Sequence, residues 1–253
     1  MTVHEGLTIT NIDQMVDLLR TGFVFRDCEF DHADLADLDA EELTLERCSL
    51  VNADFSNLVC QALRISDCKF EKANFAKADI HEAEFLNSVG TSANFRNARL
   101  NLSRMVDCDL SLCDFEGTNL FGVDLSGSKF MGVDLTSANM DGTRIDRTNF
   151  SMAALRFKKF RKQKLVGVNF TEADISGCDF TQVEFEDCHL NSAVVSDETI
   201  FDGADLRGAY ISSSQLEITS LKGTLMSAAQ AHHMLFERYG ILIVEDLEDL
   251  KKP

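Results

Sequence analysis

The stretch ANFAKADI, residues 73–80, contains two copies of one small unit: a small residue, a polar residue and a large apolar residue. The same phase runs far along the chain in both directions. Of the 36 residues at every fifth position from Phe25 to Ile200, 35 are hydrophobic, although hydrophobic residues make up only 45% of the sequence. Phenylalanine fills 14 of these positions, and Gly90 is the one exception. The sequence is therefore a repeat with a period of five.

A second rule holds two residues before each large position. Ala, Cys, Ser, Thr or Val stands there in 28 of the 36 units. A period of five fits neither an α-helix nor a strand, whose side chains repeat every 3.6 and 2.0 residues. It fits a chain that turns a corner every five residues, so that one large and one small side chain point to the axis. The eight exceptions at the small position are Phe23, Leu38, Leu43, Leu58, Leu63, Lys158, Gln163 and Glu198.

This pattern, A-(D/N)-(L/F)-x-x, resembles the pentapeptide-repeat family over residues 23–226. The resemblance implies an all-β fold, a right-handed quadrilateral β-helix with four units in each coil. Coils spaced like neighbouring strands, about 4.8 Å apart, would make a rod of about ten coils and about 48 Å. We expect residues 1–22 to form an N-terminal cap and residues 227–253 a helix-strand module with an acidic tail.

Short helices are predicted at both ends, where an open solenoid must be covered. Near the N-terminus, Asn11 is a possible N-cap and Gly22 lies past the helix end. Near the C-terminus, residues 227–230 match a capping box, and Gly240 ends the helix. The face that should pack on the first coil consists of Ile12, Met15, Val16 and Leu19.

The segment from Gln230 to Val244 resembles the ending of quinolone-resistance proteins of the Qnr type. In that family the C-terminal module makes a two-fold dimer, so the resemblance implies a homodimer here. The apolar run at 241–244 supports this expectation, because nothing in a lone rod obviously covers it. The expected contact residues are Met234, Leu235, Ile241, Leu242, Ile243 and Val244.

Residues 20 apart should stack into columns, and one column is acidic. It contains Asp34, Asp54, Asn74, Asn94, Asp114, Asp134, Ala154 and Asp174. Stacked carboxylates repel one another, which favours a role in binding. Alternatively, Asp and Asn suit a corner because they bond nearby backbone amides. The candidate partner-binding face comprises Asp34, Asp54, Asp79, Asp114, Asp134 and Asp141.

Residues 156–164, RFKKFRKQK, form a basic stretch. Lys158 and Gln163 occupy small inward positions, and burying an unpaired Lys is costly. We therefore expect a projecting loop that replaces about two repeats, which would move Asp174 out of the acidic column; a loop that is merely solvated is the alternative. A slip of one residue is also expected near residues 196–205. The basic residues of the stretch are Arg156, Lys158, Lys159, Arg161, Lys162 and Lys164.

The eight cysteines are expected to be buried thiols in a reducing, cytoplasmic setting. No secretion signal and no run of 18 apolar residues is visible, so we expect no membrane span. Most cysteines fall at small inward positions without CxxC spacing, which favours small apolar filler over a metal ladder. We predict no metal and no cofactor.

The sequence predicts a binding protein rather than an enzyme. It has no phosphate loop, GxSxG, HExxH or dinucleotide fingerprint, and a filled rod offers no cleft. Its formal charge of −18 opposes direct binding of nucleic acid. The resemblance implies a DNA mimic that binds a type II topoisomerase, DNA gyrase or topoisomerase IV, and modulates or protects it from quinolones or toxins, with residues 156–164 as the protective loop. The alternative is a rigid adaptor scaffold with no topoisomerase role.

Overall fold

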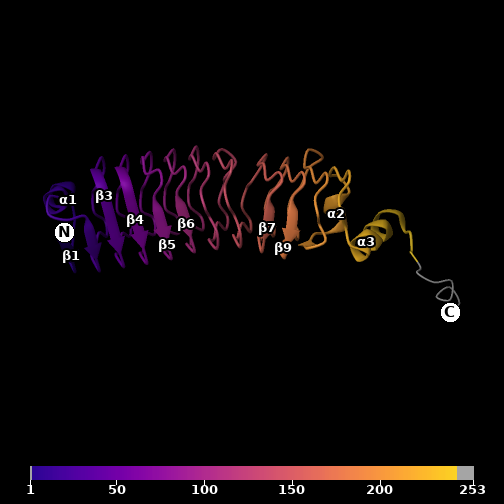
Figure 1. Cartoon of the computed structure of the whole chain (residues 1–253), viewed down its shortest axis with the longest axis horizontal. Coiled ribbons are helices and arrows are strands. Elements are labelled where there is room, and N and C mark those ends of the chain that lie inside the picture. Colours follow the sequence, from indigo (N-terminus) through magenta and orange to yellow (C-terminus); the bar gives the residue numbers. More distant parts are fainter. Residues whose placement is uncertain (1, 244–253) are drawn as a thin grey trace.

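The computed structural model describes residues 2–243, and they form one elongated rod of stacked coils (Figure 1). Parallel backbone bridges join residues that are 20 apart, such as Asp54 with Asn74 and Asp114 with Asp134. Each coil is therefore four five-residue units long. This confirms the predicted β-solenoid of about ten turns.

Regular strands are short because the chain turns at almost every fifth residue. Strands β1 to β6 form one parallel sheet, whereas β7 pairs with β8 and β9 with β10. The strands are β1 Val3–Glu5, β2 Val24–Arg26, β3 Asp39–Glu46, β4 Val59–Ser66, β5 Glu84–Leu86, β6 Arg104–Val106, β7 Lys164–Val166, β8 Glu184–Glu186, β9 Cys188–His189 and β10 Ala209–Tyr210. The helices are α1 Ile12–Leu19, α2 Ser213–Leu216 and α3 Ala228–Tyr239.

We name the four faces of the rod by the outward residue in the middle of each unit. In the coil that starts at Asp109, face D carries Asp109, face A carries Asp114, face B carries Asn119 and face C carries Asp124. Over residues 24–194, residues 20 positions apart lie on the same face. Corners D–A, A–B, B–C and C–D join the faces.

The large inward residues form stacked columns in the core. Phe75, Phe95 and Phe115 are fully buried, and their ring centroids lie 5.1–5.2 Å apart with nearly parallel planes. Where Leu38 and Leu58 fill small positions, the next large positions hold Ala40 and Cys60, so the volume of the unit is kept. The core therefore follows the predicted register and compensates locally for exceptions.

The predicted slip occurs between Val194 and Ile200. Bridges join Asp179 to Ile200 and Glu184 to Asp205, which are 21 residues apart instead of 20. Thr199 and Phe201 then take the inward positions, and both are buried. Ile200 therefore points outward, although the five-residue register that starts at Phe25 predicted it to be a large inward residue.

The solenoid begins earlier than the expected boundary at residue 23. Strand β1 pairs with β2, and Thr8 bridges to Glu29, so residues 3–11 already form part of a coil. Helix α1 then replaces face B of that coil, and Asn11 caps it by accepting a hydrogen bond of 3.0 Å from the Gln14 amide. Met15 is buried as expected, but Val16 is exposed.

Two glutamines finish the C-terminal end of the rod. Gln215 of α2 donates from Nε2 to the carbonyls of Leu190 and Ala193 at 2.8 and 2.6 Å. Gln230 of α3 donates in the same way to two carbonyls of the last coil, and with Ser227 it forms the predicted capping box. These amides satisfy acceptors that a further coil would otherwise have bonded. No helix of residues 2–243 is long and apolar enough to cross a membrane.

The basic stretch does not form a projecting loop, so that prediction was wrong. Ala154 bridges to Asp174 and Lys159 to Asp179, which keeps residues 156–164 in register and Asp174 in the acidic column. The Lys158 amine leaves the axis and donates to the carbonyls of Thr136 and Ala138 at 3.0 and 2.6 Å. Burial lowers the pKa of Lys158, but a long stem with a bonded amine fits the coil without an unpaired charge in the core.

The basic stretch does, however, interrupt the backbone bridges between two coils on faces B and C. Within residues 2–243 the bridges follow one another coil by coil on every face, except that none joins Asn139 to Lys159 or Arg144 to Lys164. A hollow of about 410 Å³ lies there, between residues 142–146 and 163–165. Faces A and D stay closed at the same level. Lys158 and Gln163 are larger than the Ala, Thr, Cys and Val that stack with them, so we attribute the interruption to these two side chains.

Truncating a core ring should be costly. We expect Phe115→Ala to lower the free energy of unfolding by about 3–5 kcal/mol, as for other buried Phe residues. Chemical denaturation, monitored by circular dichroism, measures this change. A loss below about 1 kcal/mol would contradict the stacked core.

Restoring small inward residues should close the interruption. We expect the double variant Lys158→Ala/Gln163→Val to raise the free energy of unfolding by about 1–2 kcal/mol. Each of the two missing bridges has two backbone hydrogen bonds of about 1 kcal/mol that can form again, and this gain outweighs the loss of the two bonds made by the Lys158 amine. Lys159→Ala, which removes the same charge from an exposed site of this coil, should stay within about 0.5 kcal/mol of the parent. A double variant less stable than this control would show that the Lys158 amine is needed where it is.

Candidate protein-binding faces

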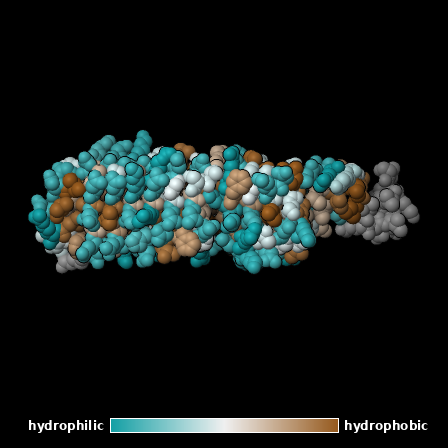
Figure 2. All heavy atoms as spheres, turned by 90° about the horizontal axis from the view of Figure 1, so that it is seen from above, coloured by the Kyte–Doolittle hydropathy of each residue, from teal (hydrophilic) through white to brown (hydrophobic). Residues whose placement is uncertain are grey.

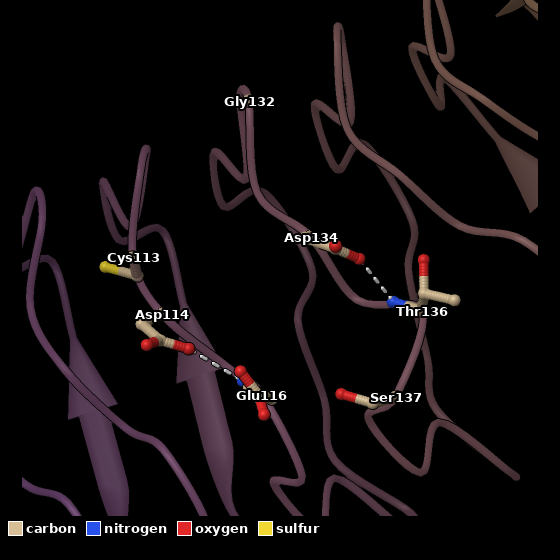
Figure 3. A pocket seen from close by; sticks show the side chains of 7 residues that line it. All are labelled: Cys113, Asp114, Glu116, Gly132, Asp134, Thr136 and Ser137. Atoms are coloured by element: carbon tan, nitrogen blue, oxygen red, sulfur yellow. Dashed lines mark hydrogen bonds between the residues drawn. The ribbon is translucent and has the colours of Figure 1, made fainter.

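The outward Asp and Asn residues of face A all serve the same corner. The Oδ1 atoms of Asp54, Asp114 and Asp134 accept hydrogen bonds of 2.8–2.9 Å from the amide two residues further on. Figure 3 shows two of these bonds, to Glu116 and Thr136. Asn94 makes the same bond with its amide oxygen. The corner role explains why Asp or Asn stands here, but it does not require the negative charge of Asp.

Side-chain amides relieve repulsion in only one half of the column. Asn94 donates to Asn74 at 3.0 Å, and Asn74 donates to Asp54 at 2.9 Å, so this part of face A is a hydrogen-bonded ladder. Asp114 and Asp134 bridge to each other directly, with no amide side chain between them. Asp34 and Asp54 are neighbours in the same way nearer the N-terminus, so the column contains two pairs of adjacent Asp residues.

Face C shows how the same fold neutralises a column. From Arg64 to Arg144 its outward residues alternate in sign. Ion pairs cross the coils there: Glu84 pairs with Arg64 at 3.6 Å and with Arg104 at 3.2 Å. The outward column of face A contains five Asp and no Lys or Arg. Arg96 and Arg156, at the A–B corner, reach two of the five, Asp114 and Asp174. Within residues 2–243, Asp34, Asp54 and Asp134 have no basic side chain within 4 Å.

The structure brings together four of the six acidic residues that were expected to form one surface. Asp34, Asp54, Asp114 and Asp134 share face A. Asp79 lies on face B, where Arg99 pairs with it at 3.1 Å. Asp141 lies at the B–C corner. These two residues are therefore not part of the acidic face.

A shallow hollow of about 550 Å³ opens on face A between the coils of Asp114 and Asp134 (Figure 3). Both carboxylates line it, and Gly132 and Ser137 at the neighbouring corners contribute little bulk. This hollow was not predicted from the sequence. Its signal was the presence of small corner residues on the coil that carries Asp134.

The basic stretch is paired with the acidic coil that follows it. Arg156 pairs with Asp174, Arg161 with Asp179, and Lys164 with both Glu184 and Glu186. Burial raises the pKa of Asp179, but hydrogen bonds from Arg161 and Thr181 outweigh this effect and hold it below its usual value. Of the six basic residues, only Lys159 and Lys162 lack an acidic or carbonyl partner within the described chain. The stretch therefore fastens one coil to the next.

The cysteines pack inside the coils. All eight are buried free thiols, and burial raises the pKa of Cys108, Cys113 and Cys178 to about 12. Cys108 donates from Sγ to the Phe85 carbonyl at 3.4 Å. No group of three or more His, Cys, Asp and Glu side chains in residues 2–243 has the geometry of a metal site. These thiols therefore contribute packing volume.

The C-terminal module leaves apolar side chains uncovered. Helix α3 has no fully buried residue, and Met234 and Leu235 are half-buried. Phe236, Tyr239, Ile241 and Ile243 are about half exposed, and Leu242 is 74% exposed. In Figure 2, hydrophobic atoms gather at this end of the rod, whereas most of its length is hydrophilic on the side in view. Val244, the last expected contact residue, lies outside the described residues.

Comparison with known proteins identifies the repeat. The family of pentapeptide repeats matches in eight copies, over residues 68–111, 106–136, 113–151 and 159–191. No curated protein matches the sequence significantly. Among solved structures, full-length QnrB1, a plasmid-mediated fluoroquinolone resistance protein, is 18% identical over 95% of this chain and 100% of its own, with a TM-score of 0.48.

A second solved structure is HetL, a pentapeptide repeat protein involved in heterocyst differentiation regulation in the cyanobacterium Nostoc sp. strain PCC 7120. It is 18% identical over 85% of this chain and 92% of its own, with a TM-score of 0.41. These two structures belong to proteins with different roles, so they do not assign one here. The five-residue register, the 20-residue coil and the matched repeats together show that the chain belongs to the pentapeptide-repeat family.

Proposed function

We propose that this rod binds a basic groove on a partner protein by presenting face A in place of a DNA backbone, and that the partner is a type II topoisomerase. The observation that carries the proposal is the acidic column of face A. Its corner hydrogen bonds need only an Asn oxygen, yet five of its residues are Asp and three of these have no basic partner in residues 2–243. Stability alone does not favour such a column, because like charges repel.

The charge density is of the right order for a DNA mimic. Duplex DNA carries one charge per about 1.7 Å. A formal charge of −18 on a rod of about ten coils and about 48 Å gives one charge per roughly 2.7 Å. A topoisomerase is the expected partner because the repeat and the C-terminal segment resemble those of gyrase-interacting members of the family.

We propose that the protein binds the enzyme but does not protect it from drugs. The expected protective loop was assigned to residues 156–164, which instead form a coil whose cations mostly pair with the next coil. No other segment of residues 2–243 projects from the coils at the scale of such a loop. We therefore expect the protein to compete with DNA for the enzyme without rescuing it from quinolones.

Two copies are proposed to join through the C-terminal module. The exposed side chains of Phe236, Tyr239 and residues 241–243 form an apolar surface at the end of the rod. Covering it with the same surface of a second chain is the self-complementary solution that two-fold symmetry provides. The resulting double rod would be about 96 Å long.

Removing charge from face A should weaken binding to the enzyme. A triple variant keeps the corner hydrogen bonds through the Asn oxygen but removes three charges per chain; its substitutions are Asp54→Asn, Asp114→Asn and Asp134→Asn. At about 0.5–1 kcal/mol for each exposed contact, the affinity for DNA gyrase should fall about 10- to 100-fold. Inhibition of supercoiling and direct binding at two salt concentrations measure the change.

A matched control separates face A from net charge. The control variant removes the same three charges from left-handed positions of the C–D corner, where Asn is well tolerated; its substitutions are Asp67→Asn, Asp107→Asn and Asp187→Asn. It should lose less than threefold in affinity. Equal losses in both triple variants would show that only overall charge matters. If the parent protein does not bind gyrase at low salt, the topoisomerase proposal fails and a rigid adaptor scaffold becomes the better description.

A charge in the C-terminal surface should separate the two copies. We expect Leu242→Asp to convert a dimer into monomers, because a carboxylate would be buried without a partner. Multi-angle light scattering gives the mass, and Val59→Asp, at an exposed site far from the end, should remain dimeric. A parent protein that is already monomeric at micromolar concentration would overturn the proposed assembly.

A further inference from the structure

Four corner residues do not fit the chemistry of their positions. In residues 2–243, 24 residues other than glycine have a positive φ, and only Leu102, Leu112, Met152 and Phe157 among them are apolar. Their φ values are 60–61°, a region where bulky side chains are uncommon. All four side chains are more than half exposed. Neither the backbone conformation nor burial favours an apolar residue at these corners.

Two of the four belong to an apolar ridge at the D–A corner, formed by Leu112, Met131 and Met152. They lie on three successive coils, since the Leu112 amide donates to the Met131 carbonyl and the Gly132 amide donates to the Ser151 carbonyl, each at 3.0 Å. Leu112 folds over Gly132: its Cδ2 would lie 2.9 Å from a Cβ at that position, so a side chain there would displace it. The three ridge side chains are 63%, 41% and 59% exposed.

The ridge is short and has a defined border. At the same corner position, the coil before it carries Ser92 and the coil after it carries Glu172. Two residues past the corner, the first two coils of the ridge carry Asp114 and Asp134, which line the hollow of about 550 Å³ in Figure 3. The apolar ridge and the carboxylates of Asp114 and Asp134 therefore lie side by side along the middle of the rod.

We propose that this strip binds a basic amphipathic α-helix of a partner protein, lying along the rod axis. Apolar side chains of the helix would pack on the ridge, and Lys or Arg side chains one helix face away would reach Asp114 and Asp134. The spacing supports a helix, because its turn of about 5.4 Å is close to the coil spacing of about 4.8 Å. Side chains at i, i+4 and i+7 therefore keep step with three coils.

This inference rests on face A as the contact face of the proposed function, but not on the partner being a topoisomerase. Carboxylates alone would attract any cation, including a flexible basic tail. The ridge adds a requirement for an ordered apolar face beside the positive one, which electrostatic mimicry of DNA does not need.

The test uses the full chain and an 18-residue fluorescent peptide made of Leu and Lys, with the Leu residues on one helical face. Fluorescence anisotropy measures its Kd. The ridge variant carries Leu112→Ser, Met131→Ser and Met152→Ser, and we expect its affinity to fall at least tenfold at unchanged protein charge. The variant should fold, since Ser92 and Ser192 already occupy the position of Leu112 and Met152 with a positive φ, and Ser111 and Ser151 occupy the position of Met131. The thermal midpoint checks folding.

A control variant removes exposed apolar residues from the opposite corner of neighbouring coils. Leu102→Ser/Phe121→Ser should change the Kd less than twofold, because these side chains lie at the B–C corner. Equal weakening by both variants would overturn the proposal. Equal binding of a scrambled peptide with the same composition would also overturn it, because charge alone would then be sufficient.

Methyl resonances locate the peptide. On titration, the methyl signals of exposed Met131 and Met152 should shift, whereas those of buried Met105 and Met140 should not. Shifts confined to other methionines would reject this strip as the site. If the rod binds the peptide but not gyrase, only the proposed topoisomerase partner fails. If it binds gyrase through face A but not the peptide, only the helix-binding inference fails.

Discussion

The whole molecule depends on the hydrogen-bonded register that sets each coil on the previous one with an offset of 20 residues. Because the offset is a multiple of the five-residue unit, large side chains stack on large ones and small on small. Single units bury little, so the stack supplies the stability that no unit has alone. The same offset also sorts the outward residues into faces. Charged residues that recur every 20 positions in the sequence therefore form a charged column on one face.

The interior of the rod could be predicted from the sequence because periodicity reports burial directly. The core columns, the slip near Ser196 and the capping box at Ser227 all follow from local residue types. The first coil was missed because residues 3–11 do not show the five-residue pattern, although Ile9 is fully buried. The fate of Lys158 was misjudged for a different reason: its position in the pattern points inward, but four methylene groups let its amine reach carbonyls of the previous coil.

The candidate surfaces were harder to predict, because an outward residue can serve the corner, a neighbouring coil or a partner. Asp134 and Asp79 occupy equivalent positions in the repeat, yet Asp79 is paired with Arg99, whereas Asp134 has no basic partner in the described chain. The hollow beside Asp134 depends on how little space Gly132 and Ser137 fill, which no residue pattern states. Ion pairs between coils therefore distinguish a face whose charges are neutralised within the rod from a face whose carboxylates are free to bind a partner.

The missing backbone bridges on faces B and C affect how the rod can bend. A rod with backbone hydrogen bonds on all four sides resists bending equally in every direction, but this rod lacks them on two adjacent sides between residues 139–145 and 159–165. It therefore consists of two stiff segments that meet at a compliant joint, and it flexes most easily by opening or closing faces B and C. Face A lies on the closed side of that joint, where Asp134 stays bridged to Ala154. The rod can change its curvature to follow a partner while the spacing of charges along face A stays nearly constant.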